Sequence, residues 1–263
     1  MTTFRYGKAA ATSDDRDFKF ARYRTAEALP VRPDDWGYDN VVQQGGWGML
    51  GNDQWGDCVW AGAAHEHLLT STVAGKPAAF DDDGVLSDYS AATGFDPNAG
   101  PPGSNPTDRG SNVRTALGYR RTTGILDANK KRHKIGAYLA LDVGKIQAGD
   151  FSEMAEAAYL FGAVGIGIQV PQSAETEFSK GEMWSYVEGS PNAGGHYVPI
   201  VAHRKHIECV TWGRVQPMGQ RFCSHYIDEA WAIVNPDFLD LNGKSPQGFD
   251  IDQLQADLAQ LGG

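Results

Sequence analysis

The pattern of apolar and polar residues divides the chain into a helical first half and a β-rich second half. Apolar and small residues at helical spacing predict helices at 58–73 and 112–122. Short runs rich in Val and Ile, bounded by Gly, Pro or charged turns, predict strands at 164–170, 197–202, 207–212 and 230–234. The change of period near residue 164 therefore indicates an α+β fold.

Proline and glycine mark the irregular parts of this pattern. Residues 95–106 are rich in both and predict a loop with rigid turns. Pro199 falls inside a predicted strand, where it cannot donate a hydrogen bond to a β-ladder. We therefore expect that strand to lie at a sheet edge or to carry a bulge.

The two ends of the chain predict separate segments. Residues 1–44 are polar and lack sustained periodicity, so we expect an extended arm that lies over the body or reaches a partner. Residues 45–240 then form one domain, with a helical half at about 45–145 and a β-rich half at about 150–240. In the tail, 241–263, Asp250 is a predicted N-cap and apolar residues recur at helical spacing, which predicts a C-terminal helix docked on the body: Ile251, Leu254, Leu258 and Leu261.

Composition excludes several classes of function. The 263 residues carry a net charge of −10, which argues against a nucleic-acid partner. No apolar run approaches the ~18 residues of a membrane span, and no secretion signal follows Met1. Three cysteines are too few for a disulfide framework, so we expect Cys209 and Cys223 to be reduced and a reducing compartment.

Cys58 is the residue with the clearest chemical potential. It stands where the glycine-punctuated turn 51–57 enters a predicted helix, and the positive end of a helix favours thiolate over thiol. The amides of Asn52 and Gln54, in the same turn, could supply a second donor to a reacting atom. His196 opens a distant predicted strand. A cysteine at a helix start and a histidine on a remote strand form the nucleophile-and-base pattern of thiol hydrolases.

These residues resemble the papain-like cysteine peptidases, in the right order from about residue 45 to 235. Asn52 stands six positions before Cys58, where that family usually has Gln as an oxyanion donor. The resemblance implies a helical half carrying the Cys58 helix, packed on a twisted antiparallel β-sheet or barrel half. It also implies that the side chain of Trp212 packs beside His196. The other segments that carry the resemblance are the post-cysteine Trp60, 112–125, 153–168, 194–196, 210–213 and 229–234.

The chain departs from that family at one position. The residue that would orient the histidine is Val210, which cannot accept the imidazole N–H. Thr211 is the expected substitute, and Asn235 is a second one. A Cys–His pair assisted by a hydroxyl or a backbone carbonyl is one outcome. The other is a papain-like fold that has lost its chemistry and serves as a virion or assembly protein. A cleft plugged by residues 1–44 would favour a scaffold or a zymogen.

The predicted function is cysteine-dependent hydrolysis of a peptide-like amide, by a peptidase or an amidase. We predict a substrate cleft lined by Trp55, Gly195 and Trp212. The surrounding segments are neutral to acidic and rich in Gly and Trp, which favours small or apolar side chains beside the scissile bond and disfavours acidic ones.

A resemblance to uncharacterised phage- and prophage-associated bacterial proteins, carried by residues 47–53, 194–199 and 210–213, implies a phage context. It implies a location in the bacterial host cytoplasm or the virion, peptidoglycan-like substrates, and virion or self-association through the arm.

We expect no cofactor and no metal. His65 and His67, two positions apart on a helix, point about 200° apart and cannot share an ion. His203 and His206 lack a carboxylate or thiol at matching spacing. Asp57 beside the thiol would raise the pKa of Cys58, so we expect its side chain to point away and to accept from backbone N–H groups.

Overall fold

The chain folds as an α+β protein around one antiparallel sheet. The computed structural model describes residues 4–26, 29–43 and 45–238, so the predicted C-terminal helix lies outside the described residues. Within them the sheet has seven strands in the order β4-β9-β5-β6-β7-β8, with β1 paired to β6, and it does not close into a barrel. The α+β prediction is confirmed. Of the two forms expected for the β-rich half, the structure has the open sheet and not the closed barrel.

The helical half is built from three helices, α2 (Cys58–Val73), α3 (Asp82–Thr93) and α4 (Val113–Thr122), and a small hairpin, β2 (Ile125–Leu126) and β3 (Arg132–His133). The helices predicted at 58–73 and 112–122 are present. Helix α3 was not predicted because it has few apolar residues. It forms because Asp81 caps it, accepting a 2.8 Å hydrogen bond from the Gly84 N–H, and because Val85 and Tyr89 are buried one turn apart.

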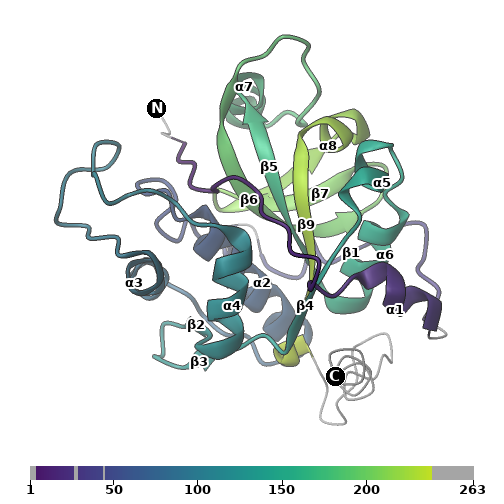
Figure 1. The fold of residues 1–263 in the computed structure, drawn as a ribbon, viewed down its shortest axis with the longest axis horizontal. Coiled ribbons are helices and arrows are strands. Elements are labelled where there is room, and N and C mark those ends of the chain that lie inside the picture. The colour runs from purple at the N-terminus through teal and green to yellow at the C-terminus, as the bar shows by residue number, and fades with distance from the viewer. Residues whose placement is uncertain (1–3, 27–28, 44, 239–263) are drawn as a thin grey trace.

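The second half carries the sheet, with helices packed on it (Figure 1). Its long strands are β5 (Val164–Pro171), β6 (Asn192–His203) and β9 (Ile227–Val234). The shorter strands are β1 (Trp36–Gly37), β4 (Ala137–Ala140), β7 (Ile207–Thr211) and β8 (Arg214–Met218). The remaining elements are α1 (Phe20–Ala26), α5 (Val143–Gln147), α6 (Ser152–Phe161), α7 (Gln172–Lys180), α8 (Gln220–Tyr226) and the 3-10 helix η1 (Pro236–Phe238).

Pro199 lies in a central strand, so its placement at a sheet edge was wrong. It pairs with Gly165 of β5, whereas the pairing of β6 with β7 involves Ile200 and the residues after it. The register with β7 shifts between Ile200 and Ala202, which is the bulge expected beside the proline. Pro199 is tolerated because it has no partner in β7 that needs an N–H.

A buried polar triad joins the two halves. Glu66 of α2 forms an ion pair with Arg120 of α4 at 2.5 Å, and the Tyr197 hydroxyl of β6 donates to Glu66 at 2.7 Å. All three side chains are at most 2 % exposed. Removing one partner of such a pair leaves the other charge buried and unpaired, which lowers the free energy of unfolding by about 3–5 kcal/mol. The triad thus fixes α2 against the strand that carries His196.

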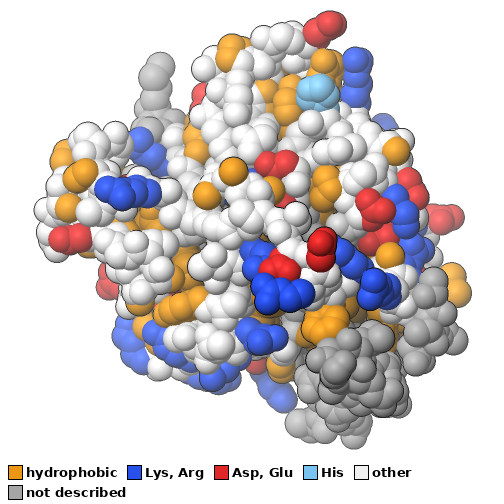
Figure 2. Space-filling view, viewed as in Figure 1, with side chains coloured by type: hydrophobic (Ala, Val, Ile, Leu, Met, Phe, Trp, Pro, Cys, Tyr) orange, Lys and Arg blue, Asp and Glu red, His pale blue; other side chains and the backbone are white. Residues whose placement is uncertain are grey.

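The first described part of the predicted arm, residues 4–9, runs across the seam between the two halves (Figure 1), but the segment 1–44 is not extended throughout, because α1 and β1 lie within it. The Gly7 and Lys8 N–H groups donate to the Gly195 carbonyl at 3.2 and 3.0 Å. On the helical side, the Ser111 N–H donates to the Gly7 carbonyl at 2.6 Å. The arm is therefore bound along its backbone to both halves. Figure 2 shows this face, where acidic and basic side chains are interspersed and neither sign forms a large patch.

In the described part of the chain, no helix combines the length and apolar character that crossing a membrane requires.

Candidate active site

Cys58 is the first residue of α2 and is only 1 % exposed. Burial, and to a lesser extent the neighbouring Asp57, raises the pKa of its thiol to about 12. The backbone of Tyr197 and Gly7 and the charge of Lys8 act in the opposite direction and lower this pKa, but they do not offset burial. The expectation that the helix terminus favours thiolate is thus wrong for this arm-covered form, because desolvation outweighs the helix dipole.

His196 lies on β6 with one ring nitrogen paired and the other free. Its Nε2 is 2.7 Å from the Thr211 hydroxyl, whereas Nδ1 is buried and has no hydrogen-bond partner among the described residues. The indole of Trp212 stacks on the imidazole at a centroid distance of 4.6 Å and an interplanar angle of 23°. Burial lowers the pKa of His196 to about 3, so the ring is neutral. Thr211 therefore occupies the orienting position expected for it, on the strand next to the histidine.

Asn235 is not at this site, so its prediction as an alternative orienter is wrong. Its amide donates to His67 Nδ1 and to the Thr70 hydroxyl, both at 2.8 Å. The cause lies in strand direction: residue 235 follows the end of β9, and its contacts are with the far end of α2 from Cys58.

One small hollow brings the sulfur and the imidazole together. Its volume is about 10 Å³, which is room for one water molecule at most. It is lined from both halves of the molecule by Met49, Asn52, Cys58, Ala61, Gly62, His65, His196, Tyr197, Val210, Thr211 and Trp212. Five of the residues predicted for the site thus meet at one point: Asn52, Cys58, His196, Thr211 and Trp212.

The amide of Asn52 lines this hollow but is already engaged in holding the turn. Its Nδ2 donates to the Trp55 carbonyl at 3.0 Å and to Asp57 Oδ1 at 3.1 Å. Asp57 is fully buried, and its side chain accepts from this amide and caps no backbone N–H of the helix, contrary to expectation. A role for Asn52 in binding an oxyanion stays a prediction, and it requires one of these two hydrogen bonds to be released.

Three predicted residues do not line the hollow: Gln54, Trp55 and Gly195. Gln54 is exposed on the turn. Trp55 is 7 % exposed and packs edge-on against Phe95 at 4.9 Å, within the core of the helical half. Gly195 is beside the site through its carbonyl, which accepts the two hydrogen bonds from the arm.

The arm contacts residues on both sides of the hollow, and the sequence did not indicate which of its residues do so. A β-carbon on Gly7 would lie 1.6 Å from the Gly56 carbonyl oxygen, so only glycine allows this approach to the turn before Cys58. The ring of Tyr6 lies 5.9 Å from His196 and 6.0 Å from Trp212, and its hydroxyl donates to Glu175 at 2.7 Å. An extended peptide has no periodicity that could have revealed these contacts.

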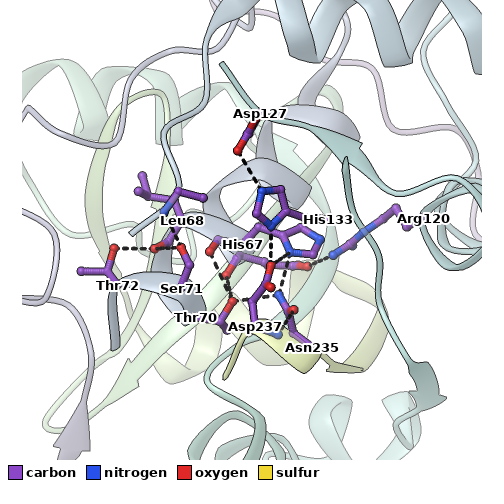
Figure 3. A network of polar contacts seen from close by, with 12 residues as sticks. His67, Leu68, Thr70, Ser71, Thr72, Arg120, Asp127, His133, Asn235 and Asp237 are labelled. Atoms are coloured by element: carbon purple, nitrogen blue, oxygen red, sulfur yellow. Dashed lines mark hydrogen bonds and ion pairs between the residues drawn. The ribbon is translucent and has the colours of Figure 1, made fainter. Parts of the chain in front are cut away.

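A second buried histidine cluster lies at the opposite end of α2 (Figure 3). His133 is held between two carboxylates, with Nδ1 2.5 Å from Asp237 and Nε2 3.0 Å from Asp127. His67 Nδ1 is 3.4 Å from the same oxygen of Asp237. Burial works against a proton on His133, but its two carboxylate partners outweigh burial and raise its pKa.

Among the described residues, His67, His133 and Asp237 are a group that could hold a metal ion, since one ligand atom of each lies within 4.8 Å of the others. Sequence spacing points only to neighbouring histidines and does not reveal this set, which tertiary folding assembles. The His133 ring can donate from both nitrogens to carboxylates, and the Asn235 amide donates to the His67 lone pair.

The fold is that of papain-like cysteine proteases. Xylellain, a cysteine protease from Xylella fastidiosa, matches with a TM-score of 0.62 and 13% identity over 89% of this chain and 97% of its own. The Carica candamarcensis protease CMS1MS2, solved with E-64, matches at 0.54 and 12% over 78% and 99%. Procathepsin L 3 of Tenebrio molitor larval midgut matches at 0.52 and 13% over 84% and 76%. No family model and no curated protein matches the sequence.

Proposed function

We propose that this protein is a thiol peptidase, seen here in a closed form. The observation that carries the proposal is the convergence of Cys58, the free Nδ1 of His196 and the Thr211 hydroxyl at one hollow. A histidine that donates from Nε2 to Thr211 presents a lone pair at Nδ1, which is the tautomer that a general base for a thiol requires. The fold shared with cysteine proteases supports the same function.

The reaction follows from these groups. His196 Nδ1 takes the proton of the Cys58 thiol, and the sulfur attacks the carbonyl carbon of the scissile amide. The Cys58 N–H, in the first turn of α2, has no intrahelical acceptor and stabilises the oxyanion. His196 then gives its proton to the leaving amine. Water attacks the resulting thioester with His196 as base, and the thiol is restored.

The arm keeps this machinery inactive. The hollow leaves no room for a substrate, and burial holds the thiol and the imidazole in their neutral forms. Hydrolysis therefore requires the arm to leave.

The test uses a substitution that dislodges the arm. Gly7→Ala cannot dock, because its β-carbon would overlap the Gly56 carbonyl. The control is Ala10→Ser, an exposed position of the same arm. We expect Gly7→Ala to cleave members of a mixed peptide library and to form an E-64 adduct, and Gly7→Ala with Cys58→Ala to do neither. A Gly7→Ala chain that neither cleaves peptides nor is labelled at Cys58, with Cys209 and Cys223 replaced, would refute the proposal.

Finer aspects of the function remain predictions from sequence. These are the phage context, peptidoglycan stem peptides as targets, amidase activity, and self-association through the arm. Purified sacculi, added to the same assay, test the peptidoglycan prediction directly.

A further inference from the structure

One residue of the arm fills a charged slot beside the candidate active site. The Lys8 side chain is completely buried, and its Nζ lies 3.0 Å from both oxygens of Asp228 and 3.1 Å from Glu229. It also donates to the Ala9 carbonyl at 3.1 Å. A lysine is almost never fully buried without such pairing. The slot is therefore built to take a cation.

The walls of this slot belong to the body of the protein and persist when the arm leaves. Asp228 and Glu229 are in β9, and Gly167 is opposite them in β5. A β-carbon on Gly167 would lie 2.0 Å from Lys8 Cε, so the absence of a side chain there gives the slot its depth. The Gln169 amide donates to Asp228 at 2.7 Å, and the Trp231 indole donates to Glu229 at 3.0 Å. These bonds hold both carboxylates in place without help from Lys8.

An empty slot would leave two adjacent carboxylates in a site with little solvent. Glu229 is 5 % exposed, and burial raises its pKa although Lys8 opposes this. A basic side chain from another peptide would restore the lost ion pairs. A cavity of about 290 Å³ borders the same two carboxylates and gives room for a guanidinium.

The slot also has a defined position relative to the sulfur. Tyr6 packs against His196 and Trp212, the Gly7 N–H donates to the carbonyl of Gly195, the residue before His196, and Lys8 lies on the other side of Gly7. The leaving amine of a substrate must lie near His196, which protonates it. The slot therefore faces the acyl side of the scissile bond.

We propose that Asp228, Glu229 and Gly167 form a specificity pocket for a lysine or arginine side chain on the N-terminal side of the scissile bond. The pocket rests on the proposed peptidase function, and it refines the sequence prediction of small or apolar side chains at the site. Rejection of acidic residues follows from the same carboxylates.

The experiment measures binding and cleavage separately, in the chain carrying Gly7→Ala and Lys8→Ala, which displaces the arm and empties the slot. Paired fluorogenic peptides contain either lysine or norleucine, an uncharged analogue of similar length, on the acyl side. We expect lysine to raise kcat/KM about ten- to hundred-fold, as expected for a charge-assisted hydrogen-bonded pair in a buried site. Asp228→Asn should reduce this ratio at least several-fold, and Gly167→Ala should reduce it further.

Binding is read out as protection of Cys58 from iodoacetamide by a peptide of residues 4–12 with lysine or norleucine at its fifth position. We expect the lysine peptide to protect at a concentration at least ten-fold lower. Equal protection by both peptides, or Cys58-dependent cleavage that is equal for both, would overturn the pocket while leaving the peptidase proposal intact. Ten-fold better protection by the lysine peptide without any cleavage would support the pocket and refute the peptidase proposal.

Discussion

The two ends of α2 each bury a histidine, and the two sites solve that problem in opposite ways. At the N-terminal end, His196 is neutral, with one nitrogen on Thr211 and the other free. At the C-terminal end, His133 is held by carboxylates at both nitrogens. A buried polar atom without a partner costs about 1–3 kcal/mol, whereas a paired one stabilises the fold. This difference is the one expected if His196 acts in the proposed chemistry and His133 stabilises the fold.

The largest expected effect is on kcat/KM, which should fall when His196 is replaced and change little when His133 is replaced. In the Gly7→Ala chain, we expect His196→Gln to lower kcat/KM by about 10³-fold or more, because the general base and its proton are lost. His133→Gln in the same chain should leave kcat/KM within about two-fold, since His133 lies at the other end of the helix. Comparable losses in both variants, measured on one peptide substrate, would contradict the assignment.

The pH dependence of stability should differ in sign between the two sites. The pKa of His196 is lowered to about 3 on folding, so the unfolded chain takes up its proton first as the pH falls below about 6.5. This proton uptake destabilises the native protein by about 2 kcal/mol between pH 7.5 and pH 5. His196→Gln should remove that loss. Urea unfolding at the two pH values measures it, and an unchanged difference would contradict burial of a neutral ring.

His133→Gln should show the opposite trend. The pKa of His133 is raised on folding, so its contribution is fully present below about pH 6.5 and is lost as the pH rises through the folded pKa. We expect the variant to lose about 1–2 kcal/mol at pH 6, from two charge-assisted hydrogen bonds, and less at pH 9. Urea unfolding of parent and variant at both pH values gives the comparison. A larger loss at pH 9 than at pH 6 would exclude a protonated His133.

The smallest expected effect concerns the orienting hydroxyl. Thr211→Val keeps the shape of the side chain but removes the partner of His196 Nε2. We expect kcat/KM to fall about ten-fold in the Gly7→Ala chain, as for one hydrogen bond that fixes a tautomer. Thr211→Ser, which keeps the hydroxyl, should recover most of the activity. If Thr211→Ser is as impaired as Thr211→Val, the hydroxyl does not orient the ring.

The sequence was most informative where local chemistry decides the structure. The helix after Cys58 and the strand of His196 are signalled by periodicity, and Thr211 stands next to the family's orienting position. The sequence was least informative where distant segments meet. Nothing in the spacing of His67, His133 and Asp237 indicates that they converge. The same is true of Lys8 and Asp228, because an ion pair across 220 positions depends on the completed fold.

The measurement that most directly tests the central claim is the rate of Cys58 alkylation by iodoacetamide as a function of pH, in the parent chain and in Gly7→Ala, with Cys209 and Cys223 replaced in both. Burial holds the pKa of Cys58 at about 12, so the parent should react slowly and gain rate only in strongly alkaline solution. Gly7→Ala should react at least about ten-fold faster at pH 7, with a plateau reached below the ordinary pKa of a cysteine, about 8.5, because His196 takes up the thiol proton. Identical profiles, or a Gly7→Ala thiol that titrates above 8.5, would contradict a Cys58–His196 pair held inactive by the arm.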